Sequence, residues 1–89
     1  MSKQLSQLFG QVIRRHREAA NLTQEELGHL SGLSRNYIGM LERGERTPTI
    51  HVLFQLAIAM STTMSDVIQE LDAALATQSG MRKRGKAEK

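Results

Sequence analysis

The pattern that most constrains this chain is a pair of short helical segments separated by one glycine, within residues 22–44. Thr23 is placed to cap the first segment, and a glutamate three residues later completes a capping box. Gly32 ends this segment, because glycine readily adopts the left-handed conformation that closes a helix. Ser34 caps the second segment, which ends at Gly44. The sequence therefore predicts two short helices joined by a tight turn.

Two segments outside this pair carry the apolar periodicity of amphipathic helices. In the N-terminal segment the apolar residues on one helical face are Leu5, Leu8, Phe9, Val12 and Ile13. Asn21 is the predicted end of that helix, because asparagine also tolerates the left-handed conformation. A second apolar stripe consists of Ile50, Leu53, Leu56, Ala57 and Met60. Its helix is capped by Thr49, or by Thr47 with a proline at the first helical position.

A further cap predicts a fifth helix. Thr63 and Asp66 form a second predicted capping box, and the helix extends to about Thr77. Its apolar residues include Val67, Ile68, Leu71 and Leu75. The predicted fold is all-α, with five short helices around one aliphatic core in a single domain over residues 1–78.

The composition excludes several classes of protein. The chain has 89 residues and no cysteine, which excludes a disulfide scaffold, thiol catalysis and cysteine-ligated zinc. His16, His29 and His51 are far apart and form no His-Glu-x-x-His pattern, so we expect no metal site and no cofactor. We expect no enzymatic activity, because the sequence has neither a nucleophile elbow nor a phosphate-cradling glycine-rich loop. No apolar run approaches the ~18 residues of a membrane span, so we expect a cytoplasmic protein.

The positive charge is concentrated at the C-terminal end. The formal net charge is +3, but residues 1–79 carry seven basic and eight acidic side chains. Residues 80–89 carry five basic side chains and one acidic side chain. We predict that residues 79–89 form a basic, disordered tail, which either contacts DNA non-specifically or is only a solvated end.

The two central helices have the geometry of a helix-turn-helix, whose second helix is narrow enough to enter the major groove of DNA. Residues 9–68 resemble the lambda-repressor-like, Xre-type helix-turn-helix family. The resemblance rests on Phe9-Gly10, Ile13, Arg17, the run TQEELGHLSGLSRNYIGMLERGERTP at 23–48 and the run LFQLAIAMSTTMSDVI at 53–68. It covers about two-thirds of the chain without gaps, and it implies a five-helix, lambda-repressor-like DNA-binding domain with its helix-turn-helix at 23–43.

The resemblance also implies roles for individual residues. The residues at base-reading positions are Arg35, Asn36 and Met40. Arginine suits guanine, asparagine suits adenine, and methionine can contact a thymine methyl group. The residues at phosphate-contacting positions are Gln24, Tyr37, Arg43, Arg46 and Thr47. An exposed charge can also be merely solvated, and the tyrosine and the methionine can also simply pack against the fold.

In the family, the counterparts of Arg17 and Glu42 form an ion pair that joins the first helix to the third. The alternative is two independent surface charges. The chain departs from the family pattern at Gly28, where alanine is usual and where either residue is expected to be small enough for close helix packing. It also has Gly39 inside the second helix of the helix-turn-helix, the recognition helix that would enter the major groove. We expect glycine to be merely tolerated there.

One recognition helix reads only a few base pairs, so a second copy about one helical turn away (~34 Å) would multiply discrimination. The predicted dimer interface lies on the fifth helix and consists of Ile68, Leu71, Ala74 and Leu75. Alternatively, these residues only cover the first helix.

The resemblance implies a homodimeric transcriptional regulator that binds double-stranded DNA at a palindromic operator. Restriction–modification controllers and small phage-type repressors have this organisation. Such a chain would be bacterial or phage-encoded and nucleoid-associated when bound. The alternative is a protein-interaction module, antitoxin-like or a dimerisation partner, with little DNA binding of its own.

Overall fold

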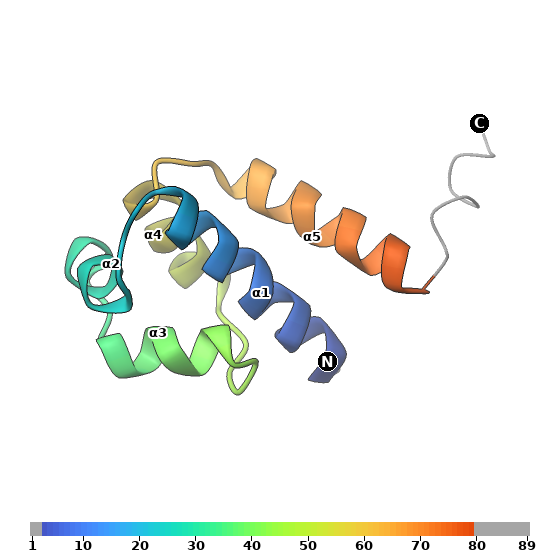
Figure 1. Cartoon of the computed structure of the whole chain (residues 1–89), viewed down its shortest axis with the longest axis horizontal. Helices are drawn as coiled ribbons and strands as arrows, with labels where there is room; N and C mark the ends of the chain where they lie inside the picture. The colour runs from blue at the N-terminus through green and yellow to red at the C-terminus, as the bar shows by residue number, and fades with distance from the viewer. Residues whose placement is uncertain (1–2, 80–89) are drawn as a thin grey trace.

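The computed structural model describes residues 3–79, and within this range the chain forms five α-helices and no strand (Figure 1). The helices are α1 (Lys3–Ala19), α2 (Gln24–Ser31), α3 (Arg35–Glu42), α4 (Ile50–Ala59) and α5 (Met64–Ser79). The predicted all-α fold with five helices is confirmed. The basic tail predicted at 79–89 overlaps the last helix, because Ser79 still belongs to α5, and residues 80–89 lie outside the described range.

Side-chain caps start four of the helices. Thr23 Oγ1 accepts a hydrogen bond from the Glu26 amide at 3.0 Å, and the Glu26 carboxylate accepts one from the Thr23 amide at 2.9 Å, which completes the predicted capping box. Ser34 caps α3 through the Tyr37 amide in the same way. Thr49, and not Thr47, is the cap of α4. The last of the four caps is at α5, where Thr63 accepts from the amide three residues later.

The chain leaves each of the first four helices through a residue in the left-handed conformation. These residues are Asn21, Gly32, Gly44 and Ser61, with φ of 60°, 80°, 76° and 60°. Gly32 is the C-cap of α2, and its amide donates to the Gly28 carbonyl. The turn after α2 is therefore short enough to set α3 directly against α2.

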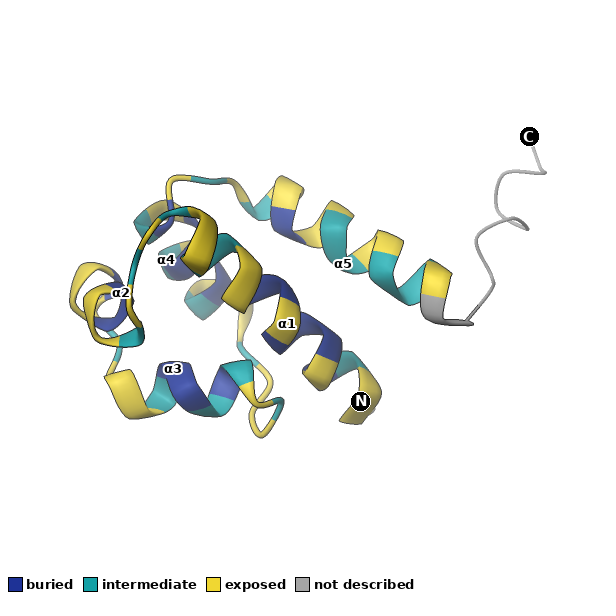
Figure 2. Ribbon diagram, in the orientation of Figure 1, coloured by how far each residue is buried: buried dark blue, intermediate teal, exposed yellow. Residues whose placement is uncertain are grey.

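The core is aliphatic except for Phe9 and draws on all five helices (Figure 2). Its fully buried side chains are Val12, Ile13, Leu27, Ile38, Leu41, Leu56 and Val67. Helix α1 packs against α3 and α5, and α2 packs against α3 and α4. Burial of Ile38 and Leu41 in this core fixes which face of α3 remains outside.

The prediction for Gly28 is wrong, because alanine would not fit there without a shift of the backbone. A Cβ added to Gly28 would lie 2.6 Å from the carbonyl oxygen of Leu33 in the turn. Helix α2 thus lies so close to the backbone of the turn at this point that even a methyl group would force the two apart.

Helix α4 has two apolar faces, and Ile50, which was predicted in the buried stripe, is exposed. Four residues of its predicted stripe are buried, but Ile50 is 71% exposed. Phe54 and Ile58 follow it at four-residue spacing and are 48% and 59% exposed. Within residues 3–79 no single helix is long and apolar enough to cross a membrane, and α4 with Met64–Thr77 reaches that length only across a bend of 107°.

A polar cluster joins α1 to α5. Arg15 donates two hydrogen bonds to Glu70 Oε2, at 3.0 and 2.9 Å, and His16 Nε2 lies 2.7 Å from Glu70 Oε1. Partial burial raises the pKa of Glu70, but the hydrogen bond and charge of Arg15, with the neighbouring histidine, outweigh it and hold the pKa below its ordinary value. The Glu70 carboxylate therefore stabilises the docking of α5 in its ionised form.

Candidate nucleic-acid interface

Helix α3 presents its N-terminal end to solvent. Arg35 and Asn36 are its first two residues, and both are exposed. Tyr37 and Met40 are half-buried, and Tyr37 packs against the core. Of the three residues predicted to read bases, the arginine and the asparagine are thus fully available to a partner, while the methionine is only partly so.

A small polar hollow lies between α2 and α3. Its lining residues are Gln24, Arg35, Asn36, Gly39 and Arg43. Four of the eight residues predicted to contact DNA thus meet at one place, although they come from two helices and the turn after the second. Donor groups dominate this lining, and a donor-rich surface suits the phosphates and base acceptors of DNA.

A buried ion pair holds α3 against α1. Arg17 Nε donates to Glu42 Oε2 at 2.7 Å, and Arg17 Nη2 donates to Glu42 Oε1 at 2.9 Å. The two side chains are only 11% and 4% exposed. The hydrogen bond to Glu42 raises the pKa of Arg17. The third nitrogen of the guanidinium donates to the Leu22 carbonyl just before α2, so this pair braces three helices at once.

Gln24 connects this ion pair to the hollow. Its Nε2 donates to Glu42 Oε1 at 3.1 Å, beside the bond from Arg17. A Cβ added to Gly39 would lie 3.9 Å from the same Nε2, which places the amide over the middle of α3. One amide group therefore lies between a buried carboxylate and the surface of the recognition helix.

The Arg43 side chain lies along α3 and is hydrogen-bonded to Glu45. Its Nε and Nη2 donate to the two oxygens of Glu45 at 2.8 and 3.2 Å. This bond and the positive charge lower the pKa of Glu45. Arg43 Nη1 passes over Gly39, where an added Cβ would lie 3.0 Å away. Because the end of an arginine side chain can move, alanine would be accommodated at this glycine, in keeping with the expectation that glycine is merely tolerated.

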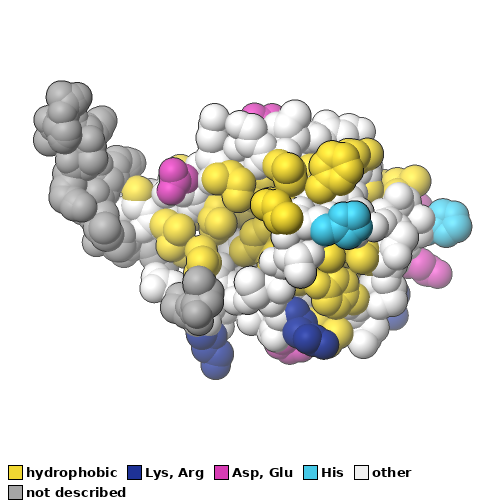
Figure 3. Space-filling model, turned by 180° about the vertical axis from the view of Figure 1, so that it is seen from behind, with side chains coloured by type: hydrophobic (Ala, Val, Ile, Leu, Met, Phe, Trp, Pro, Cys, Tyr) yellow, Lys and Arg dark blue, Asp and Glu magenta, His cyan; other side chains and the backbone are white. Residues whose placement is uncertain are grey.

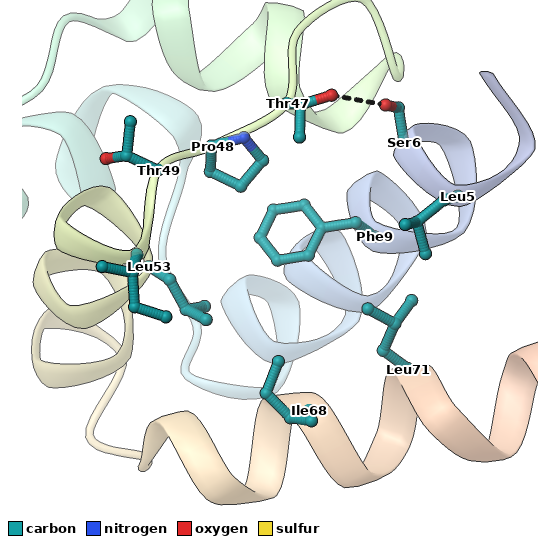
Figure 4. Close-up of a pocket in the computed structure, with 10 residues that line it drawn as sticks. Leu5, Ser6, Phe9, Thr47, Pro48, Thr49, Leu53, Ile68 and Leu71 are labelled. Atoms are coloured by element: carbon teal, nitrogen blue, oxygen red, sulfur yellow. Dashed lines mark hydrogen bonds between the residues drawn. The ribbon is translucent and has the colours of Figure 1, made fainter. Parts of the chain in front are cut away.

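The last two predicted phosphate contacts lie in the loop before α4. Arg46 is exposed. Thr47 Oγ1 lies 2.7 Å from the Ser6 hydroxyl of α1, so this hydroxyl is already hydrogen-bonded within the chain (Figure 4). Thr47 lines an apolar groove with Phe9 and Ile68 and is not part of the polar hollow. The structure thus separates Thr47 from the other predicted phosphate contacts.

The four residues predicted to form a dimer interface differ in exposure. Ile68 is 45% exposed, whereas Leu71, Ala74 and Leu75 are half-buried. Leu71 packs against the core of its own chain. Sequence reasoning missed the exposed stripe of α4, although its signal was present: a helix with two apolar faces has a second face to cover.

Within residues 3–79, no group of three or more His, Cys, Asp or Glu side chains could hold a metal ion. The described part of the site consists instead of hydrogen-bond donors on a short, rigidly braced helix. Comparison with known proteins decides which family builds such a site.

A helix-turn-helix family model, HTH_3, matches residues 13–67. The chain belongs to this Cro/Xre-like helix-turn-helix family. The control protein C.SmaI of Serratia marcescens is 38% identical over 64 residues, which are 72% of this chain and 76% of that protein.

Solved structures agree with this assignment. The restriction–modification controller protein C.AhdI of Aeromonas hydrophila is 39% identical and superposes with a TM-score of 0.68 over 70% of this chain and 94% of that one. The clp gene regulator ClgR of Corynebacterium glutamicum is 25% identical, with a TM-score of 0.80 over 93% of this chain and 88% of that one. Members of the family are transcriptional regulators and not enzymes, and they bind double-stranded DNA. This member is a DNA-binding transcriptional regulator.

Proposed function

We propose that this regulator recognises a specific sequence of double-stranded DNA as a homodimer bound to a palindromic operator. The observation that carries the proposal is the exposure of Arg35 and Asn36 at the N-terminal end of a short helix whose opposite face is fixed in the core. Arginine pairs with the O6 and N7 of guanine, and asparagine pairs with the N6 and N7 of adenine. We assign base reading to these two residues and an apolar contact to Met40.

Phosphate contacts would set the register of the helix on DNA. We assign them to Gln24, Tyr37, Arg43, Arg46 and Thr47. Three of these side chains have partners of their own, since Gln24 and Arg43 are each bonded to a glutamate and Thr47 to a serine. A DNA phosphate would compete with the glutamate for Arg43 and share the hydroxyl of Thr47.

The proposed dimer interface is larger than the one expected from the sequence, because it includes α4. The exposed apolar side chains are Ile50, Phe54 and Ile58 on α4 and Ile68 on α5. Hydrophobic side chains gather on the corresponding face of the molecule (Figure 3). A groove of about 160 Å³ runs into this face beside Ile68 and Leu71. An apolar surface of this kind is typical of a protein–protein interface, and a second copy bound through it would supply a second recognition helix.

The interface is tested by the double variant Phe54→Asp, Ile68→Asp. Burying two carboxylates in an apolar interface is strongly unfavourable, so sedimentation at micromolar concentration should show a dimer for the unaltered chain and a monomer for the variant. Leu30→Asp is the matched control, because Leu30 is 58% exposed on α2, where it lines a hollow with Glu25, Glu26 and His29 and does not line the groove beside Ile68. Leu71 is avoided because a charge there would disturb the core.

Three outcomes separate the proposals. A variant that is still dimeric contradicts the interface. An unaltered chain that is monomeric and retains DNA contradicts the homodimer alone. An unaltered chain that retains no DNA at low salt supports the alternative of a protein-interaction module.

We further propose a cytoplasmic location, with association to the nucleoid in the bound state, in keeping with the bacterial origin of the similar regulators.

A further inference from the structure

The carboxylate of Glu42 bonds two different side chains. Both oxygens accept from Arg17, and Oε1 accepts from Gln24 as well. A bidentate pair between arginine and glutamate is complete without the glutamine. The bond from Gln24 is therefore not needed for the brace between α1 and α3.

This bond fixes the orientation of the Gln24 amide. An ionised carboxylate only accepts hydrogen bonds, so the Nε2 of Gln24, and not its Oε1, must face Glu42. The Glu42 side chain is 4% exposed, so water competes little for that bond. Gln24 is also the first residue of α2, which fixes its backbone, and its amide lines the polar hollow beside Arg35 and Arg43.

The nitrogen of a primary amide carries two hydrogens. One is bonded to Glu42, and the second remains for an acceptor outside the protein. A DNA phosphate, which only accepts, matches that requirement. The positive charge of Arg17 also neutralises Glu42, so that this carboxylate does not repel the phosphate.

We propose that Glu42 is a positioning residue for DNA binding: it holds the amide of Gln24 so that a fixed N–H group meets a backbone phosphate. This inference rests on the proposed function, and it adds a role for Glu42 beyond bracing the fold. In variants that remain folded, the effect of Glu42 on the affinity for DNA is then expected to act through Gln24.

The nearly isosteric variant Glu42→Gln tests this dependence. Arg17 only donates, so it takes the single oxygen of the new amide, whose NH2 group then faces Gln24. Gln24 must turn its own oxygen toward that group, and its donor is no longer fixed. The expected result is a loss of affinity of about tenfold to a hundredfold for every DNA sequence, the size of one charge-assisted hydrogen bond.

A double-mutant cycle separates positioning from bracing. Anisotropy titrations with labelled DNA, at a temperature where thermal melts show all variants folded, compare the unaltered chain, Glu42→Gln, Gln24→Ala and the double variant. The proposal expects Glu42→Gln to weaken binding in the unaltered background and to have no further effect on Gln24→Ala. Equal losses in both backgrounds would overturn it and leave Glu42 with a bracing role only.

A second measurement uses only the unaltered protein, so it does not depend on whether a variant folds. In NMR spectra of the unaltered protein, one side-chain amide proton of Gln24 should be protected from solvent exchange in the free state, and both should be protected in the complex with DNA. Two rapidly exchanging protons in either state would overturn the proposal. Absence of DNA binding by the unaltered chain is a distinct result, since it would remove the proposed function itself and this inference with it.

Discussion

Replacing Glu42 by alanine should destabilise the fold by about 3 kcal/mol, because it leaves Arg17 buried without its partner. Breaking a buried pair from one side costs about 3–5 kcal/mol. The lower end applies here, because Arg17 retains its bond to the Leu22 carbonyl and is 11% exposed. For a domain of this size, 1 kcal/mol corresponds to a change in Tm of about 4–8 °C, so the expected decrease is about 12–24 °C.

Thermal denaturation followed by circular dichroism measures this decrease. Glu18→Ala is the matched control, because it breaks the Arg14–Glu18 pair on α1, whose side chains are 63% and 55% exposed. An exposed pair of this kind contributes about 0.5 kcal/mol or less. A decrease in Tm for Glu42→Ala that is no larger than in this control would refute the buried ion pair as a brace of the recognition helix.

Three further changes test the interface and the docking of α5. Arg35→Ala should cost about 1–3 kcal/mol at one base pair and relax the preference there in titrations against operator variants, whereas equal weakening on all sequences would make Arg35 a phosphate contact. Glu45→Gln removes the carboxylate that competes with a DNA phosphate for Arg43, so binding to all DNA should tighten; an unchanged affinity would contradict that phosphate contact. Because the pKa of Glu70 is lowered in the folded state, its contribution to stability is fully present above its ordinary pKa of 4.5 and is lost as the pH falls through the folded value. Thermal melts below pH 4.5 should therefore show a smaller loss of stability for Glu70→Gln than for the unaltered chain, and identical pH profiles would speak against the Glu70 cluster.

The local signals of the sequence predicted the helices well. Thr23, Ser34 and Gly32 act on backbone groups within a few residues, so a cap or a left-handed turn can be predicted from the residue types alone. The five-helix fold followed from these signals and from apolar periodicity. The Cro/Xre-like family followed from the spacing of particular residues within and between those helices.

Features that depend on contacts between helices could not be predicted in this way. The clash that excludes alanine at Gly28 arises from the backbone of the turn after α2. Thr47 is held by Ser6, which is 41 positions away along the chain. Ile50 belongs to an apolar helix with two apolar faces, and periodicity alone does not determine which face is buried. The bond from Gln24 to Glu42 likewise exists only because the brace of α1 and α3 places a carboxylate beside α2.

Sequence-specific recognition by a homodimer is tested by selecting binding sites from random double-stranded DNA with the purified chain. We expect an enriched palindrome with two half-sites about one helical turn apart (~34 Å), with a preference at one base pair of each half-site that disappears with Arg35→Ala. Enrichment of no sequence, or of a single site without a repeated half, would contradict sequence-specific recognition by a homodimer.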